Sequence, residues 1–436
     1  MKKPLYVLVL IPLGLWATFA LPGVVAEAKG FWDWRQALIV LSGVLALWWM
    51  SAGMVLATRP VWLERRFGGL DKLYRLHKNI GIGAGILVLA HWLAEWLPKN
   101  LGKLGLFDRP SHPHGHGAES LWLGLAKDVG EWAGYILMAL VVLALVKRIP
   151  YRYFRWVHRA FAPVFLAGAF HGLMLMPTDF WRQPLGWFTA AMAVIGVVPA
   201  LLSLAGRIGA DRRHPARIEA LRPLPDGVLE VVLRPIGRWP GHRAGQFLFV
   251  DFGHAGEGAH PFTIASAWAV ADGTLTIAIK ALGDYTRSLP GRVAVGNAAT
   301  LEGPYGDFTF DTGTAGRQVW VAGGIGITPF LARLRELAAG GRRPSQADLF
   351  YCTRGSLGAE IEAELATLCR DAGVCLHRRL TDDQGPLDSA EVEARLAPEA
   401  SVWFCGPAAW GKALADALAR KGLPAKAFHR EAFEFR

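Results

Sequence analysis

The stretch YRYFRWVHRAFAPVFLAGAFHGLMLM, residues 151–176, combines a basic start with a long apolar run that contains histidine. The segment KNIGIGAGILVLAHWLAEW, residues 78–96, repeats this arrangement. The two segments carry four histidines: His158 and His171 within the first, His77 directly before the second, and His91 inside it. At a rise of about 1.5 Å per residue, the two histidines of each segment lie roughly 20 Å apart along a helix.

Two such helices side by side would bring the four imidazoles into two pairs, one near each face of a bilayer. Ionisable groups in a membrane segment are costly and tend to mark function. The alternative is that each histidine is a polar residue bonded to a neighbouring helix. Four histidines at matched depth favour two haems of b type, one bound by His77 and His158 and the other by His91 and His171.

The spacing within the first segment does not fit a regular helix. Fourteen residues are about 3.9 turns, which returns His91 to the face of His77, but thirteen are about 3.6 turns and leave His171 well round the helix from His158. Pro163 removes a helix hydrogen bond, so we predict a local change of winding there.

Long apolar runs fill the first half of the chain, which has 436 residues of which 52% are hydrophobic. A helix needs roughly 20 apolar residues to cross a bilayer. Six charge-free runs are of about that length, the fourth being the shortest: 4–26, 36–58, 79–94, 132–146, 160–178 and 183–206. The sequence therefore predicts six transmembrane helices.

The net charge of +11 could indicate nucleic acid, but the placement of the basic residues excludes that class. They gather at the N-terminus and in every second gap between the apolar runs, at 59–78, 147–159 and 207–217. Loops rich in Lys and Arg stay in the cytoplasm. We therefore expect an inner-membrane protein with both termini in the cytoplasm, His77 and His158 near the inner face, and His91 and His171 near the outer face.

The N-terminus allows a second interpretation. Its MKK, the apolar stretch and Ala26-Glu27-Ala28 resemble a secretory signal peptide with a cleavage site. The apolar run is longer than a usual signal core, so we favour a retained helix. Cleavage would not change the orientation of the later helices.

Two further patterns bear on metal binding. The cysteines form no CxxC pair and should be free thiols, so neither a disulfide framework nor a zinc site is indicated; they are Cys352, Cys369, Cys375 and Cys405. The predicted outer loop contains His112, His114 and His116 among Gly and Pro. Such a tract can bind a transition metal, although it is more often a mobile surface loop.

The composition changes after residue 210, where short alternating runs replace the long apolar ones. Period-two alternation broken by Pro, Gly and Asp predicts antiparallel strands, in a small β-barrel at 211–315. Beyond that, strands alternate with helical stretches, which predicts a doubly wound α/β domain at 316–436. With the membrane helical bundle at 1–210, we expect three domains.

A glycine-rich turn, GGIGITP at 323–329, lies between a predicted strand and a helix. Backbone N–H groups in such a turn can approach a pyrophosphate, and the helix N-terminus adds favourable partial charge. A tight turn selected for packing is the alternative. Ligands of doubly wound sheets bind at the carboxyl ends of the strands, and CGP at 405–407 follows another predicted strand.

Five short motifs follow one another in this half: HPFT at 260–263, Lys280 with GDYT at 283–286, GPYG at 303–306, GGIGITP, and FCGP at 404–407. This series resembles the ferredoxin-NADP reductase family. With the histidine-bearing helices before it, the chain resembles the membrane NADPH oxidase and ferric reductase superfamily, especially its compact bacterial members. The resemblance covers nearly everything from about Gln36 to Arg436.

The resemblance implies an FAD site and an NADPH site. Phe262 would lie along the isoalloxazine and Thr263 would approach its reactive edge. The expected FAD-binding residues are His260, Pro261, Phe262, Thr263, Lys280, Gly283, Thr286 and Gly303. The nicotinamide nucleotide would bind Gly324, Gly326, Thr328, Pro329, Cys405, Gly406 and Pro407. Phe433 or Phe435 would cover the flavin, unless the tail is a strand that closes the sheet.

Arg354 adds an expectation about the nucleotide. It follows the predicted strand at 349–353, close to where the ribose should end, and a guanidinium there suits a 2′-phosphate.

The implied activity is electron transfer from cytoplasmic NADPH through FAD and two haems to an acceptor outside, with oxygen and hence superoxide as the expected case. The same pathway could serve a ferric or cupric reductase, or a membrane subunit that donates electrons to a periplasmic protein. One departure from the animal oxidases is Glu95, one turn after His91, where a cationic or imidazole group is expected. We expect no obligatory protein partner.

Overall fold

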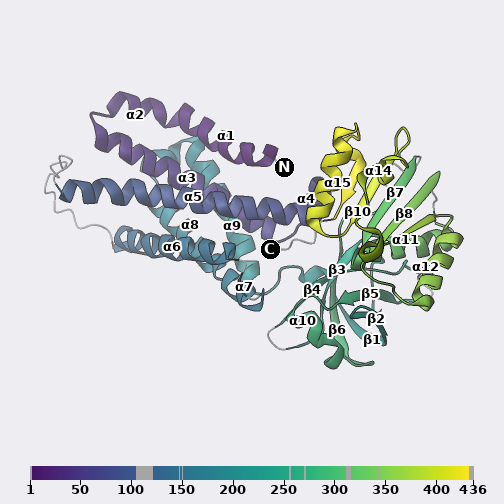
Figure 1. Ribbon diagram of the computed structural model, residues 1–436. Coiled ribbons are helices and arrows are strands. Elements are labelled where there is room, and N and C mark those ends of the chain that lie inside the picture. Colours follow the sequence, from purple (N-terminus) through teal and green to yellow (C-terminus); the bar gives the residue numbers. More distant parts are fainter. Residues whose placement is uncertain are drawn as a thin grey trace. The chain divides into compact units, whose positions relative to one another are not determined.

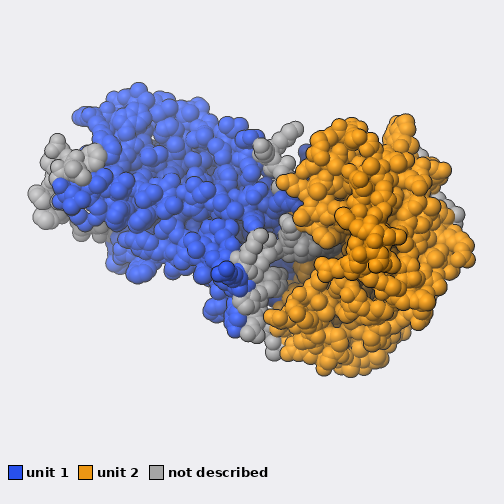
Figure 2. All heavy atoms as spheres, viewed as in Figure 1, with its two compact units in different colours: residues 1–67, 72–209, 436 blue, residues 68–71, 210–435 orange. Residues whose placement is uncertain are grey.

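The computed structural model describes residues 2–104, 121–146, 148–149, 151–254, 257–269, 272–310, 316–341 and 344–431. The histidine tract at 112–116 and the two C-terminal phenylalanines, Phe433 and Phe435, lie outside the described residues. The chain divides into two compact units (Figure 2), the first comprising residues 1–67, 72–209 and 436, and the second residues 68–71 and 210–435.

The first unit is helical (Figure 1). Its α-helices are α1 (Lys2–Phe19), α2 (Leu21–Glu27), α3 (Phe31–Ala57), α4 (Val61–Phe67), α5 (Leu70–Lys103), α6 (Leu121–Leu145), α7 (Tyr151–His158), α8 (Phe161–Met174) and α9 (Pro184–Leu204). A short 3-10 helix, η1 (Thr178–Arg182), precedes α9.

Four of these helices, α3, α5, α6 and α9, are long and apolar enough to cross a membrane, and the bent pair α1 and α2 could form a fifth span. The pair bends by 43°. The sixth predicted run, at 160–178, forms α8, which has only 14 residues. The prediction of a membrane helical bundle is thus confirmed, whereas the number six is not confirmed for the described residues.

The change of winding predicted at Pro163 lies earlier in the chain. Helix α7 ends at His158, and α8 begins at Phe161 after a break at Arg159 and Ala160. Pro163 is in the first turn of α8, where a missing N–H breaks no helix hydrogen bond. His158 and His171 are therefore on two helices, so a regular thirteen-residue spacing does not fix their relative directions.

An antiparallel sheet opens the second unit. Its strands are β1 (Arg213–Leu224), β2 (Val228–Pro235), β3 (Phe247–Asp251), β4 (His260–Thr263), β5 (Leu275–Lys280) and β6 (Ala298–Tyr305), in the order β4-β3-β6-β1-β2-β5. The sheet curls so that one bridge, between Ile264 and Ile277, joins its two edges. Apolar residues fill the interior, including Val231, Leu248 and Leu301. Three short helices accompany the sheet: η2 (Ala210–Arg212), α10 (Asp284–Ser288) and η3 (Leu289–Gly291).

A parallel sheet follows, as the alternation of strands and helices predicts. Its strands are β7 (Arg317–Gly323), β8 (Gln346–Thr353), β9 (Cys375–Leu380), β10 (Ser401–Cys405) and β11 (Phe428–Arg430), in the order β11-β10-β7-β8-β9. Its helices are η4 (Gly324–Ile327), α11 (Thr328–Ala338), α12 (Ala359–Ala372), α13 (Thr381–Gln384), α14 (Ser389–Glu393), α15 (Ala408–Arg420) and η5 (Ala425–Ala427). The strand order reverses between β7 and β10, and ligands of such sheets bind at that point.

Candidate functional site

The first unit brings the four predicted histidines together in two pairs. The ring centroids of His77 and His158 are 6.0 Å apart, with 60° between the ring planes. Those of His91 and His171 are 6.3 Å apart, at 89°. Helix α5 supplies one member of each pair, and α7 and α8 supply the other two.

These separations suit a metal ion between the rings. An imidazole-to-metal bond is about 2.0 Å, so two imidazoles that share one metal ion have ring centres roughly 6 Å apart. Both observed distances lie close to that value. The four side chains therefore fit two haem irons.

Three of the four imidazoles are oriented by backbone carbonyls. Nδ1 lies within hydrogen-bond distance of a carbonyl oxygen in each: His77 of Gly53 at 3.0 Å, His91 of Ile39 at 2.9 Å, and His171 of Ala126 at 2.8 Å. When Nδ1 donates a proton in this way, the tautomer is fixed and Nε2 is left as a metal ligand of raised basicity. The sequence gives no signal for these partners.

Gly130 makes the position of His171 possible. A Cβ atom on Gly130 would lie 1.9 Å from Nδ1 and 2.3 Å from Cγ of His171. Because Gly130 has no side chain, the imidazole can lie against α6 and reach the carbonyl of Ala126, one turn earlier. The sequence analysis does not single out this glycine.

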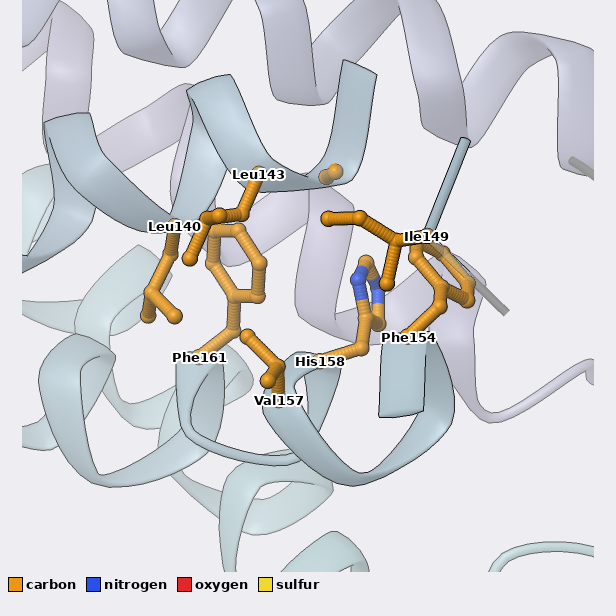
Figure 3. A pocket seen from close by; sticks show the side chains of 8 residues that line it. Leu140, Leu143, Ile149, Phe154, Val157, His158 and Phe161 are labelled. Atoms are coloured by element: carbon orange, nitrogen blue, oxygen red, sulfur yellow. The ribbon is translucent and has the colours of Figure 1, made fainter. Parts of the chain in front are cut away.

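His158 has an apolar surrounding (Figure 3). The rings of Phe154 and Phe161 lie 5.0 Å and 4.8 Å from it between centroids. Leu140, Leu143, Ala144, Ile149 and Val157 line the same pocket. Such a lining suits the apolar edge of a porphyrin, and it excludes water from the imidazole.

Glu95, one turn after His91, forms ion pairs with two basic side chains. Its carboxylate accepts a hydrogen bond of 2.5 Å from the guanidinium of Arg35, which is only 11% exposed, and also pairs with Lys99. Arg35 comes from α3, one turn before Ile39, the partner of His91. A cation is thus present beside the outer pair, although the sequence places it far from His91.

The HPFT motif forms β4, whose ring side chains are buried to different degrees. Phe262 is largely buried in the interior of the curled sheet, 6.4 Å from Phe252 between ring centroids, and Thr263 is also buried. His260 is half-buried and stacks on Tyr285 at 3.9 Å. Strand β4 pairs with β3 and lies at the edge of the sheet order. The predicted contacts with flavin stay predictions.

Two of the residues predicted around the pyrophosphate, Lys280 and Thr286, already have partners within the second unit. Lys280 pairs with Asp226 at 2.5 Å, and Oγ1 of Thr286 accepts hydrogen bonds from the N–H groups of Leu282 and Gly283 at 3.0 Å each. Gly303, in β6, is buried. A diphosphate at Lys280 would therefore share the ammonium group with Asp226, which the motif alone does not indicate.

The two predicted nucleotide-binding turns touch at the point where the sheet order reverses. A Cβ atom on Gly326 would lie 2.2 Å from the carbonyl oxygen of Cys405, so only glycine fits there. Gly324 has a φ of 54°. Oγ1 of Thr328 donates to the carbonyl of Ile325, and Pro329 is in the first turn of α11. Gly406 and Pro407 separate β10 from α15.

Two more residues complete this region. Arg354 is exposed directly after β8, the strand next to β7. Glu431 is buried near Gly306 and influences Cys405, whose pKa is raised well above its usual value by burial and then by the Glu431 charge. Cys405 is therefore a neutral thiol at neutral pH. Glu431 could not be predicted from the sequence, because an acid in the C-terminal tail has no distinctive spacing.

Comparison with known proteins bears on both units. Residues 42–169 match the ferric reductase like transmembrane component family, and residues 214–309 match an FAD-binding domain family. The first match contains His77, His91 and His158 and ends two residues before His171. The chain thus combines a ferric reductase like transmembrane component with an FAD-binding domain, a combination consistent with the NADPH oxidase and ferric reductase superfamily. It is a multi-pass membrane protein.

Two relatives from Arabidopsis thaliana illustrate the superfamily. Ferric reduction oxidase 8 is 37% identical over 106 residues, which cover 22% of this chain and 15% of that protein. Respiratory burst oxidase homolog protein D is 25% identical over 318 residues, which cover 61% of this chain and 33% of that protein. The chain thus spans less than half the length of either relative.

A flavohaemoglobin from Malassezia yamatoensis resembles the chain in fold. The two share 17% identity with a TM-score of 0.50, over 91% of this chain and 97% of the other. This similarity concerns the fold alone.

Proposed function

We propose that the protein carries electrons across the inner membrane, from cytoplasmic NADPH to an acceptor on the outer side. When bound, FAD takes a hydride from NADPH and the two haems pass single electrons. Residues 1–210 would hold the haems in six membrane spans, residues 211–315 the FAD, and residues 316–436 the NADPH, with the last two parts in the cytoplasm. The two facing histidine pairs support this proposal most strongly.

The protein's own residues bind and orient the reactants. His77 and His158 would hold the inner haem, and His91 and His171 the outer one, with backbone carbonyls orienting the rings of His77, His91 and His171. The turns at Gly326 and Cys405 would bind the nucleotide, because they lie at the carboxyl ends of β7 and β10, where backbone N–H groups can approach a pyrophosphate. The neutral thiol of Cys405 would border the nicotinamide without repelling a hydride.

Oxygen is the acceptor that we favour, with superoxide as the product. Each superoxide takes one electron, so one NADPH supplies two oxygen molecules and releases one proton. Arg35 supports this choice, since a guanidinium beside the outer pair favours the formation of an anion. It also neutralises Glu95, which makes that carboxylate a weaker ligand for an incoming metal ion. Ferric or cupric reduction and donation to a periplasmic partner remain the alternatives.

The acceptor assay separates these cases. With NADPH as donor, the purified protein should reduce cytochrome c in a reaction that superoxide dismutase abolishes. If dismutase has no effect and ferric chelates are reduced under argon at an equal or higher rate, the metal-reductase function is correct. Slowing of that rate by replacement of His112, His114 and His116 would support it further. Little turnover with either acceptor would point to a partner protein.

Arg354→Ala is expected to erode a preference for NADPH over NADH. The guanidinium would pair with the 2′-phosphate, which NADH lacks, and a hydrogen bond to a charged group is worth roughly 1.5–3 kcal/mol. KM for NADPH should rise about tenfold with kcat nearly unchanged, and KM for NADH should not move. Equal kcat/KM for the two nucleotides in the unaltered protein would contradict the assignment.

A further inference from the structure

Three side chains of different chemistry meet on one face of the parallel sheet, away from the turns that would bind the nucleotide. Cys375 and His377 are two residues apart in β9, so both side chains point to the same face. Asp348 in β8 is the direct partner of Cys375 in the strand register. One ligand atom from each residue lies within 4.8 Å of the other two.

This set of atoms suits a transition metal. Thiolate sulfur, imidazole nitrogen and carboxylate oxygen are the usual ligands of zinc, at about 2.3, 2.0 and 2.1 Å. Ligands at these distances in a tetrahedron are roughly 3.3–3.6 Å apart, so small side-chain movements would close the site. Nε2 of His377 lies 2.8 Å from Oδ1 of Asp348, and a metal ion would replace the proton between them.

The surrounding side chains hold two of the three ligands in place. Arg317 donates two hydrogen bonds to Oδ2 of Asp348, at 2.7 and 3.0 Å, which leaves Oδ1 for a metal. The ring of His377 stacks on Phe350 at 4.6 Å. Hydrogen bonds and stacking contacts of this kind fix the orientation of side chains that bind a metal ion.

Two arginines near Asp348 carry positive charge, which would repel a metal cation. Arg317 stays paired with Oδ2, and Arg395 lies 4.0 Å from Oδ1 with a side chain that is 44% exposed and free to turn to solvent. The Asp348 carboxylate and a Cys375 thiolate would together offset the charge of a divalent ion.

We propose that Asp348, Cys375 and His377 form a binding site for a thiophilic divalent transition metal, with zinc as the probe. Binding would release the proton of the Cys375 thiol, the His377 ring would bind through Nε2 with its proton on Nδ1, and water would take the fourth position. Because β9 is the edge strand of the sheet, the ion would fasten that edge to β8. This site is independent of the proposed electron transfer.

Alkylation of Cys375 provides a residue-specific test. Cys375 is exposed, whereas the other three cysteines are buried, so iodoacetamide should modify it first. In the full-length protein, micromolar Zn²⁺ should slow alkylation of the Cys375 peptide at least about tenfold by mass spectrometry. Metal bound at the histidine tract at 112–116 would not affect this readout.

Two histidine variants and the thermal midpoint test whether protection by Zn²⁺ depends on the proposed ligands. His377→Ala should abolish the protection by Zn²⁺, while His254→Ala, at a half-buried histidine that follows β3, should leave it intact. If the His377 variant does not fold, the thermal midpoint serves instead: Zn²⁺ should raise it in the unaltered protein and not in Cys375→Ser. Equal alkylation rates with and without Zn²⁺ in the unaltered protein would overturn the site.

Discussion

Replacing His171 by alanine is expected to leave the protein with one haem instead of two. The His171 imidazole is held by the carbonyl of Ala126, and its ring centroid lies 6.3 Å from that of His91. Its loss would therefore remove one of the two proposed ligands of the outer haem. Loss of a group that hydrogen-bonds to a metal ligand typically lowers metal affinity 10–100-fold. Loss of the ligand itself should lower the affinity for the outer haem by more than about 100-fold. The haem content, measured as pyridine haemochrome per chain, reports this directly.

The other three histidines provide the internal comparison. His91→Ala should give the same single haem as His171→Ala, whereas His77→Ala and His158→Ala should remove the inner haem and leave the outer one. Reduction of bound FAD by NADPH should continue in all four variants, because the second unit is unchanged, while reduction of an external acceptor should fall by more than about 100-fold. Two haems in each variant would exclude these residues as ligands.

Gly130→Ala is expected to disturb the outer haem without any change in a ligand. The added Cβ would lie 1.9 Å from Nδ1 of His171, so the ring has to leave the Ala126 carbonyl and lose its direction. Haem content should fall toward one per chain, or the outer haem should bind 10–100-fold more weakly.

Gly134, one turn later on α6, is the matched control. A Cβ atom there meets nothing within 4 Å. Glycine costs roughly 0.5–1 kcal/mol relative to alanine inside a helix, so Gly134→Ala should keep both haems in a protein that is at least as stable. Two haems with an unaltered spectrum in Gly130→Ala would show that the glycine does not position His171.

The arrangement of the histidines could be predicted because it depends on depth along apolar helices, and depth follows from sequence position. The orientation of each imidazole ring could not be predicted from the sequence. The partners of His91 and His171 are carbonyls on other helices, and Gly130 matters only because α6 and α8 pack together. The break after His158 was sought at Pro163, because proline is the visible signal.

The same limit applies in the second unit. The order of the motifs indicates an FAD-binding domain, which the comparisons confirm for residues 214–309. Strand β6 lies inside the sheet order although it ends in Gly303, Pro304 and Tyr305, residues that the sequence presents only as part of the GPYG motif. The pairing of Lys280 with Asp226 joins residues 54 positions apart. Likewise, Asp348 and His377 meet only through strand register, so no cysteine pattern indicates a metal site.

The central claim is that electrons from NADPH reach two haems in one chain. The most direct measurement is the spectral change when NADPH is added without oxygen to the FAD-loaded protein, calibrated to the protein concentration. Its amplitude should correspond to two haems of b type per chain. An amplitude near one haem, or no haem reduction although the flavin is bleached, would contradict the account.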